Sequence, residues 1–198
     1  MNRSILGLGV TIFSLSHSLL SPLIALSVNK LGVRITLFIG STIISLGSLL
    51  MSFLVKGSIS YILVYGCIIG FGFGFGAMIP VQSGITLWFK KKKALALSIV
   101  LAAAGVGGFV ASPTVNKIIQ FSGGNWRIAW IFISGLTVIS AIISILFVKN
   151  KPSDLNQIQD GFNHVENSKN ITDNKSQVYH TEINWTINEA IKTKSLWL

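Results

Sequence analysis

Residues 35–55 read ITLFIGSTIISLGSLLMSFLV and contain no charged side chain. A helix of about 20 apolar residues crosses the roughly 30 Å hydrocarbon core of a bilayer, because each residue rises about 1.5 Å. Four other runs share this character, at residues 5–28, 59–83, 94–118 and 128–148, and their single charged residue is Lys117. The five runs predict five membrane-spanning helices, because lipid offers backbone N–H and C=O groups no partner outside the helix.

The composition agrees with a membrane protein. Of 198 residues, 51% are hydrophobic and 11% are charged, and the mean hydropathy is +0.67. Soluble domains carry about 25% charged residues, so this chain has too little polar surface to cover a water-soluble globule. Its single cysteine, Cys67, excludes a disulfide scaffold. The expected fold class is an all-α polytopic membrane protein.

The formal charge of +10 is unevenly distributed. Residues 1–153 contain twelve Lys and Arg and no Asp or Glu, and all six acids follow in residues 154–198. The basic residues lie in the gaps between apolar runs and form no continuous patch, so nucleic acid is not an expected partner. Eight of them lie in alternate gaps, at Lys30, Arg34, Lys90, Lys91, Lys92, Lys93, Lys149 and Lys151. The positive-inside rule predicts that these loops and the tail are cytoplasmic in a protein of the cell membrane.

The chain divides into three predicted parts. Residues 1–149 form the five-helix bundle, and residues 150–181, rich in Asn, Ser, Asp and Lys, form a flexible cytoplasmic loop. Residues 182–198 form an amphipathic helix and the start of a truncated next span. Thr186 and Glu189 have the spacing of a capping box for that helix.

Small residues are concentrated in the third and fourth runs. Gly70 and Gly74, and likewise Ala104 and Gly108, are four residues apart. Small residues at this spacing let helix backbones approach closely in a membrane. We therefore expect these four residues to pack helices together.

Five polar side chains within the runs are candidates to line a substrate path. They are His17, Ser14, Tyr65, Gln82 and Asn116. An ionisable group inside a membrane is a functional hypothesis by default, although a histidine bonded to a neighbouring helix is the commoner outcome. The four lysines at 90–93 fit an anchor at anionic lipid headgroups. Before residue 154 there is one histidine, one cysteine and no carboxylate, so neither catalysis nor a metal or cofactor site is expected.

The loop at residues 29–34 resembles a motif of the major facilitator superfamily. The family pattern after its second helix is Gly-x-Leu-x-Asp-Arg-x-Gly-Arg-Arg. Gly32 and Arg34 match this pattern, Lys30 is a conservative change, and Asn29 replaces the Asp. A structural role is expected for this loop.

Four further stretches resemble one branch of that family. Residues 88–96, with the small residues and Pro113 that follow, are similar to the fifth helix of monocarboxylate transporters and oxalate/formate antiporters. Asn125-Trp126-Arg127 is similar to the Gly-Trp-Arg before the sixth helix. Residues 151–161 are similar to the start of the central loop in bacterial members, and residues 185–190 resemble the amphipathic helix before the seventh span. The resemblance implies that the five spans are helices two to six of a twelve-helix carrier, without its first helix and its C-terminal half.

This resemblance implies secondary active transport of a small organic anion, monocarboxylate or dicarboxylate-like, by alternating access. The driving gradient is that of the substrate or of protons, and the missing C-terminal half is an expected partner together with membrane lipid. The alternative is a small helical membrane protein that acts as a structural or accessory subunit without transport.

Overall fold

The computed structural model describes residues 3–152, which are helical apart from short connections and contain no strand. The elements are α1 (Arg3–Leu19), α2 (Ser21–Phe53), α3 (Ser58–Tyr61), the π-helical segment η1 (Ile62–Ile69), α4 (Gly70–Gly76), α5 (Met78–Trp88), α6 (Lys93–Phe121) and α7 (Trp126–Phe147). Four stretches are long and apolar enough to cross a membrane: Ser21–Phe53, Ser58–Trp88, Lys93–Phe121 and Trp126–Phe147. The prediction of an all-α membrane fold is confirmed. The predicted amphipathic helix and nearly all of the predicted loop lie outside the described residues.

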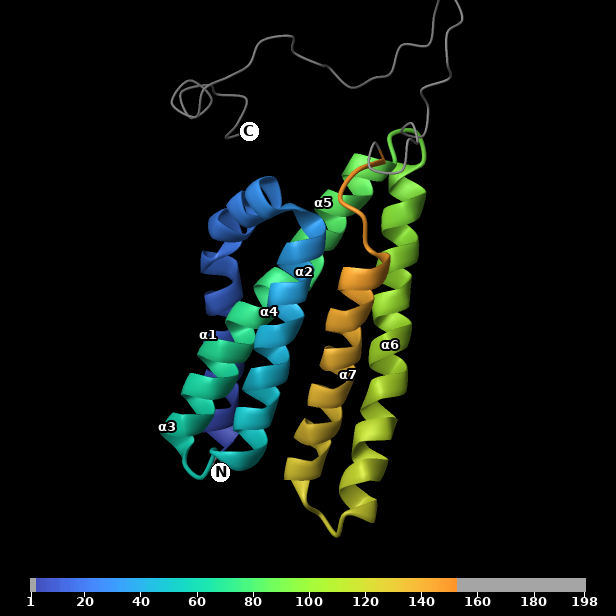
Figure 1. The fold of residues 1–198 in the computed structure, drawn as a ribbon. Helices are drawn as coiled ribbons and strands as arrows, with labels where there is room; N and C mark the ends of the chain where they lie inside the picture. The colour runs from blue at the N-terminus through green and yellow to red at the C-terminus, as the bar shows by residue number, and fades with distance from the viewer. Residues whose placement is uncertain (1–2, 153–198) are drawn as a thin grey trace, which may run out of the picture. The chain divides into compact units, whose positions relative to one another are not determined.

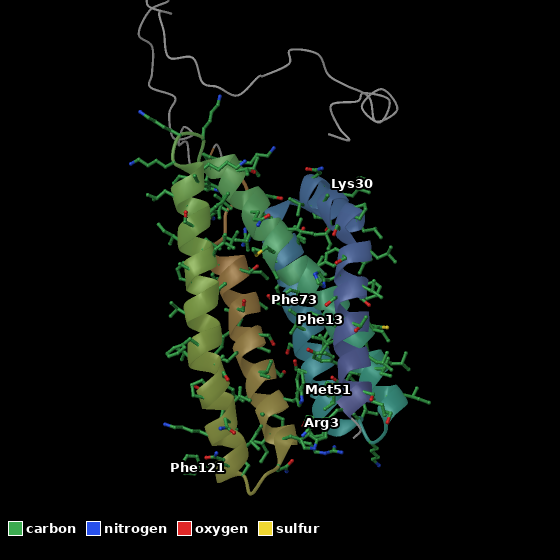
Figure 2. All side chains as sticks on the ribbon, turned by 180° about the vertical axis from the view of Figure 1, so that it is seen from behind. Arg3, Phe13, Lys30, Met51, Phe73 and Phe121 are labelled. Atoms are coloured by element: carbon green, nitrogen blue, oxygen red, sulfur yellow. The ribbon has the colours of Figure 1, made fainter. Side chains whose placement is uncertain are left out.

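The first apolar run contains α1 and the beginning of α2. The two helices are separated at Leu20, two residues before Pro22, which has no N–H to donate to the preceding turn. At Gly32 the backbone leaves the helical region (φ 84°, ψ 166°), and the chain turns back on itself there (Figure 1). The hydroxyls of Ser27 and Thr36 lie 3.2 Å apart across this turn. Lys30, in the loop motif, lies at the opposite end of the bundle from Arg3 (Figure 2).

The third apolar run is divided into α3, η1, α4 and α5. The largest interruption is at Ala77, whose φ of −121° and ψ of −122° separate α4 from α5. Pro80 follows in the first turn of α5, where the absence of its N–H leaves no helical hydrogen bond unmade. The run is therefore continuous in sequence but bent in space.

A serine seam joins α2 to α7. Ser45 and Ser134 are buried, and their hydroxyls lie 2.9 Å apart. Ser144 on α7 donates from Oγ to the carbonyl of Arg34 at 3.0 Å. Small hydroxyl side chains let two helices approach closely and supply hydrogen bonds where lipid offers none. The seam therefore fixes α7 against residues 33–53 of α2.

Both ends of this part of α2 are capped by residues that flank or begin α7. At its start, Asn150 Oδ1 accepts a hydrogen bond from the Arg34 backbone N–H at 2.9 Å. At its end, the Arg127 guanidinium donates to the carbonyls of Ser52 at 2.5 Å and Val55 at 3.0 Å. Helix ends leave unpaired N–H and C=O groups, which need partners when they are away from water. The α7 region supplies partners at both ends.

The helix α6 stands apart from this packing. It runs beside α7 (Figure 1), yet none of its residues is buried among residues 3–152. Phe109, midway along it, is 83% exposed. The face of α6 turned away from α7 is thus covered by no described part of the chain.

We predict that Gly32→Ala destabilises the bundle by about 1–3 kcal/mol, because a side chain at positive φ is strained. A Cβ at Gly32 would also lie 2.6 Å from the Asn150 side chain and displace the cap on Arg34. Thermal unfolding in detergent, followed by circular dichroism, measures the change.

The matched control is Gly7→Ala in α1, where a Cβ meets no atom within 4 Å. This variant should be unchanged or more stable by up to about 1 kcal/mol, because Ala favours helices over Gly. Equal unfolding midpoints for the two variants would contradict the strained-turn interpretation.

Candidate functional site

The run GFGFGFG, residues 70–76, directs its glycines toward two neighbouring helices. A Cβ at Gly70 would lie 3.1 Å from the Phe13 carbonyl oxygen on α1. A Cβ at Gly40 on α2 would collide with the backbone of Gly76. The helix α4 therefore approaches α1 with one face and α2 with another, at distances at which an added Cβ would force its neighbours to shift. The intervening Phe71 and Phe73 remain 43% and 40% exposed.

This close approach assembles a group of rings that we call the aromatic ladder. Its members are Tyr61, Tyr65, Phe13, Phe73, His17 and Trp130, contributed by α1, α3, η1, α4 and α7. Tyr61 and Tyr65 stack with centroids 5.3 Å apart, and Tyr65 stacks on Phe13 at 5.4 Å. Phe13 lies 5.2 Å from Phe73, and Figure 2 shows these two rings next to each other. Ring pairs at these separations add to stability beyond the area they bury.

His17 is the ionisable imidazole of the ladder. Its ring lies 5.6 Å from Phe13 and 5.7 Å from Phe73, edge-on to the latter. Nδ1 lies 3.1 Å from the Phe13 carbonyl oxygen, which can only accept, so Nδ1 carries the hydrogen in this bond. In the neutral ring Nε2 then has a lone pair to accept a proton or a substrate hydroxyl. The His17 side chain is half-buried, so part of it remains exposed.

The structure brings together two of the five predicted path residues. His17 and Tyr65 both contact the ring of Phe13. Ser14 lies on the exposed side of α1, and Gln82 and Asn116 are exposed on α5 and α6. No hydrogen bond among residues 3–152 connects these three to the ladder.

The four predicted packing residues divide into two pairs. Gly70 and Gly74 lie against the first part of the chain, and a Cβ at Gly74 would be 2.7 Å from Ile24 Cδ1 and 3.5 Å from His17 Cβ. Ala104 and Gly108 are exposed on α6, and a Cβ at Gly108 would meet nothing within 4 Å. Of the two predicted pairs, the first packs closely against other helices within residues 3–152, and the second does not.

The loop motif forms the turn at Gly32 and the start of the second part of α2. Arg34 contributes its backbone N–H to Asn150 and its carbonyl to Ser144, while Asn29 and Lys30 are exposed. The four anchor residues Lys90, Lys91, Lys92 and Lys93 are exposed between α5 and α6. The motif is thus placed where its backbone is held by the α7 region.

Sequence reasoning missed the roles of Arg127 and Asn150. Arg127 was expected only as a loop charge and as part of a family motif, although it caps the end of α2. The sequence signal available was Asn125, a residue type favoured at helix N-caps, which places Arg127 in the first turn of α7. In the structure the Asn125 Oδ1 accepts from the Arg127 N–H at 3.1 Å and caps α7. For Asn150 no local signal exists, because its partner Arg34 is distant in sequence.

The described residues bring together aromatic rings and one imidazole. No group of three or more His, Cys, Asp or Glu comes together within residues 3–152. What the fold does assemble is a wall of rings with one imidazole, held by glycine contacts inside a helical bundle. Together with the four stretches long and apolar enough to cross a bilayer, this arrangement defines a helical multi-pass membrane protein.

Comparison with known proteins identifies the family. The family model described as Major Facilitator Superfamily matches residues 1–191. The chain belongs to this family of membrane transporters, as its sequence motifs predicted.

Individual relatives carry transporter names. The "Uncharacterized transporter ESBP6" of Saccharomyces cerevisiae is 31% identical over 147 residues, which is 72% of this chain and 20% of the relative. Monocarboxylate transporter 12-B of Danio rerio is 30% identical over 67% of this chain and 28% of its own length. The hexuronate transporter of Bacillus subtilis is 25% identical over 75% of this chain and 34% of its own length. The chain thus spans about a fifth to a third of the length of these three relatives.

We predict that Gly70→Val destabilises the bundle by about 1–3 kcal/mol, because added methyl groups overpack a tight contact. The side chain would press on the Phe13 backbone and on Ser16 Cβ, both of which support the ladder. The control Gly108→Val has the same chemistry in open space and should change stability by less than about 0.5 kcal/mol. Thermal unfolding in detergent provides the measurement, and an equal loss at both positions would show that helix propensity, not packing, controls the effect.

Proposed function

We propose that this chain forms part of a secondary active carrier that moves a small organic anion, monocarboxylate or dicarboxylate-like, across the cell membrane. The observation that carries the proposal is the aromatic ladder with His17 in it, inside a bundle of the Major Facilitator Superfamily. The names of the monocarboxylate and hexuronate transporters among the relatives support an organic acid as solute. Residues 1–153 contain twelve basic residues and no acid, and a field of this sign attracts anions more than cations.

Alternating access requires a second group of helices that faces this bundle. The C-terminal half of the same carrier is the partner we propose, with the solute bound at the interface near the midplane. The exposed sides of α1, α4 and α6 support this arrangement, because Ser14, Phe73 and Gly108 on these helices have no neighbour that buries them in residues 3–152. The driving force is the gradient of the solute or of protons.

His17 is the residue we propose for contact with the solute or a coupled proton. With Nδ1–H committed to Phe13, Nε2 is the atom that exchanges a proton or hydrogen-bonds the solute. Phe73 and Phe13 shield two sides of the ring, so exchange occurs from the remaining side. Tyr65 extends the same wall toward α7 through Trp130.

Uptake of radiolabelled lactate and oxalate tests the proposal, with the chain expressed within its full reading frame. An inward proton gradient should stimulate uptake, and His17→Gln should lower that stimulation by about tenfold, equivalent to about 1.4 kcal/mol. Glutamine retains a donor for the Phe13 carbonyl but cannot take up a proton.

The control is Thr42→Ala on α2, whose hydroxyl donates within its own helix to the Phe38 carbonyl at 2.8 Å and which should retain at least half of the uptake. Stable insertion with no uptake of either solute would reject transport and favour an accessory subunit. Undiminished proton stimulation in His17→Gln would reject the role of His17 alone.

The orientation is a second proposal, in which the lysines at 90–93 are cytoplasmic and Lys117 is outside. In a Cys67→Ser background, Lys117→Cys should react with a membrane-impermeant maleimide in intact cells. Lys91→Cys should react only after permeabilisation, because these positions lie at opposite ends of α6. The reverse labelling pattern would invert the topology.

A further inference from the structure

A cavity of about 720 Å³ lies between the ends of α1, α2 and α7 and the start of the third apolar run. Its lining includes Met51, which Figure 2 places at the same end of the bundle as Arg3 and Phe121. Pockets for small ligands have volumes of about 300–1,000 Å³. The cavity is thus of a size to accept a small organic molecule.

Four aromatic side chains give this cavity flat walls. They are Tyr61, Tyr65, Trp126 and Trp130. The two tyrosines stack with only 7° between their planes, and Trp130 stands edge-on to Tyr65 at 6.0 Å. Flat walls held at fixed angles favour a flat apolar ligand, because ring contacts depend on geometry as well as area.

Two cations, Lys56 and Arg127, also line the cavity. The Arg127 guanidinium is held by the Ser52 and Val55 carbonyls, with Phe53 O at the limit of hydrogen bonding at 3.5 Å. A guanidinium has five N–H donors, so these three contacts leave donors for a ligand. The contacts fix its position without neutralising its charge, because carbonyls are uncharged.

No carboxylate of the bundle balances these charges. Residues 1–153 contain no Asp or Glu, and Lys56 makes no hydrogen bond within residues 3–152. Its ammonium is exposed and can reorient toward the cavity. Charge-assisted hydrogen bonds from Lys and Arg to carboxylate are among the strongest in proteins. The cavity thus presents two cations and lacks an anion.

We propose that this cavity binds a planar monocarboxylate, with the carboxylate at Lys56 and Arg127 and the apolar body along the aromatic walls. An anionic lipid also has an anionic head on an apolar body and could therefore use the same contacts. We assign the soluble carboxylate because the aromatic walls suit a flat body. Tyr65 belongs both to this cavity and to the aromatic ladder, so the site adjoins His17's surroundings. Delivery of solute from this cavity to the aromatic ladder rests on the proposed transport function. Binding of the carboxylate in the cavity does not depend on that function.

Equilibrium binding of radiolabelled benzoate to the 198-residue chain, in nanodiscs of phosphatidylcholine, tests the site. Benzoate should bind saturably, and benzyl alcohol, which has the same ring without the charge, should not compete at tenfold higher concentration. Lys56→Met should weaken benzoate binding at least tenfold. This variant should fold, because Lys56 is exposed and caps no helix, whereas Arg127 holds the end of α2 and is left unchanged.

The matched control is Lys117→Met, which removes a lysine outside the cavity and should leave benzoate affinity within twofold of the unmodified chain. Equal losses in the two lysine variants, competition by benzyl alcohol, or no saturable binding would each overturn the site. Replacing part of the lipid with phosphatidylglycerol tells the two sources apart. Unchanged benzoate affinity supports the soluble ligand, and competition by the lipid overturns that assignment.

Failure of this site and failure of the proposed function have different signatures. Uptake by the protein expressed from the full reading frame, without saturable benzoate binding, would reject the cavity site and support transport. Saturable, Lys56-dependent binding of benzoate without uptake would support the cavity site and reject transport.

Discussion

The hydrogen bonds between α7 and residues 33–53 of α2 are the constraint on which the rest of the bundle depends. Gly32 breaks α2, and the helix ends at Phe53, so two sets of backbone groups are left without partners. Asn150 accepts from one group of the first set, the Arg34 N–H, and Arg127 donates to carbonyls of the second, with the Ser45–Ser134 pair between them. Where lipid replaces water, each unpaired backbone group costs several kcal/mol. The position of α7 along α2 is therefore determined at both ends and in the middle.

The packing on the other side of α2 has a different basis, the absence of side chains. Glycines of residues 70–76 approach α1 on one face of α4 and α2 on another, while Phe71 and Phe73 between them stay partly exposed. This arrangement brings Phe73 beside Phe13 and His17. This contact within the aromatic ladder thus follows from the close approach of the α4 backbone to α1.

The contacts on the two sides of α2 position the residues of both proposed ligand-binding regions. Glycine contacts position the imidazole of His17, and the capping contacts position the guanidinium of Arg127. Tyr65 touches both regions, stacked on Phe13 and edge-on to Trp130. Arg127 has a structural role at the end of α2 and still has N–H donors for a ligand, because its guanidinium has five. Its charge also remains, because its partners are neutral carbonyls.

The sequence by itself determined the fold class and the family, because uncharged runs of about 20 residues have few alternatives to helices in a membrane and several motifs occur in family order. It also singled out His17, Tyr65, Gly70 and Gly74, since polar and small residues are conspicuous in apolar runs. Only the tertiary structure decided which of these meet. Ser14, Gln82 and Asn116 are exposed, and Gly108 faces open space, because composition and spacing do not specify which face of a helix meets another. Partners as distant in the chain as Asn150 and Arg34 are brought together by packing alone.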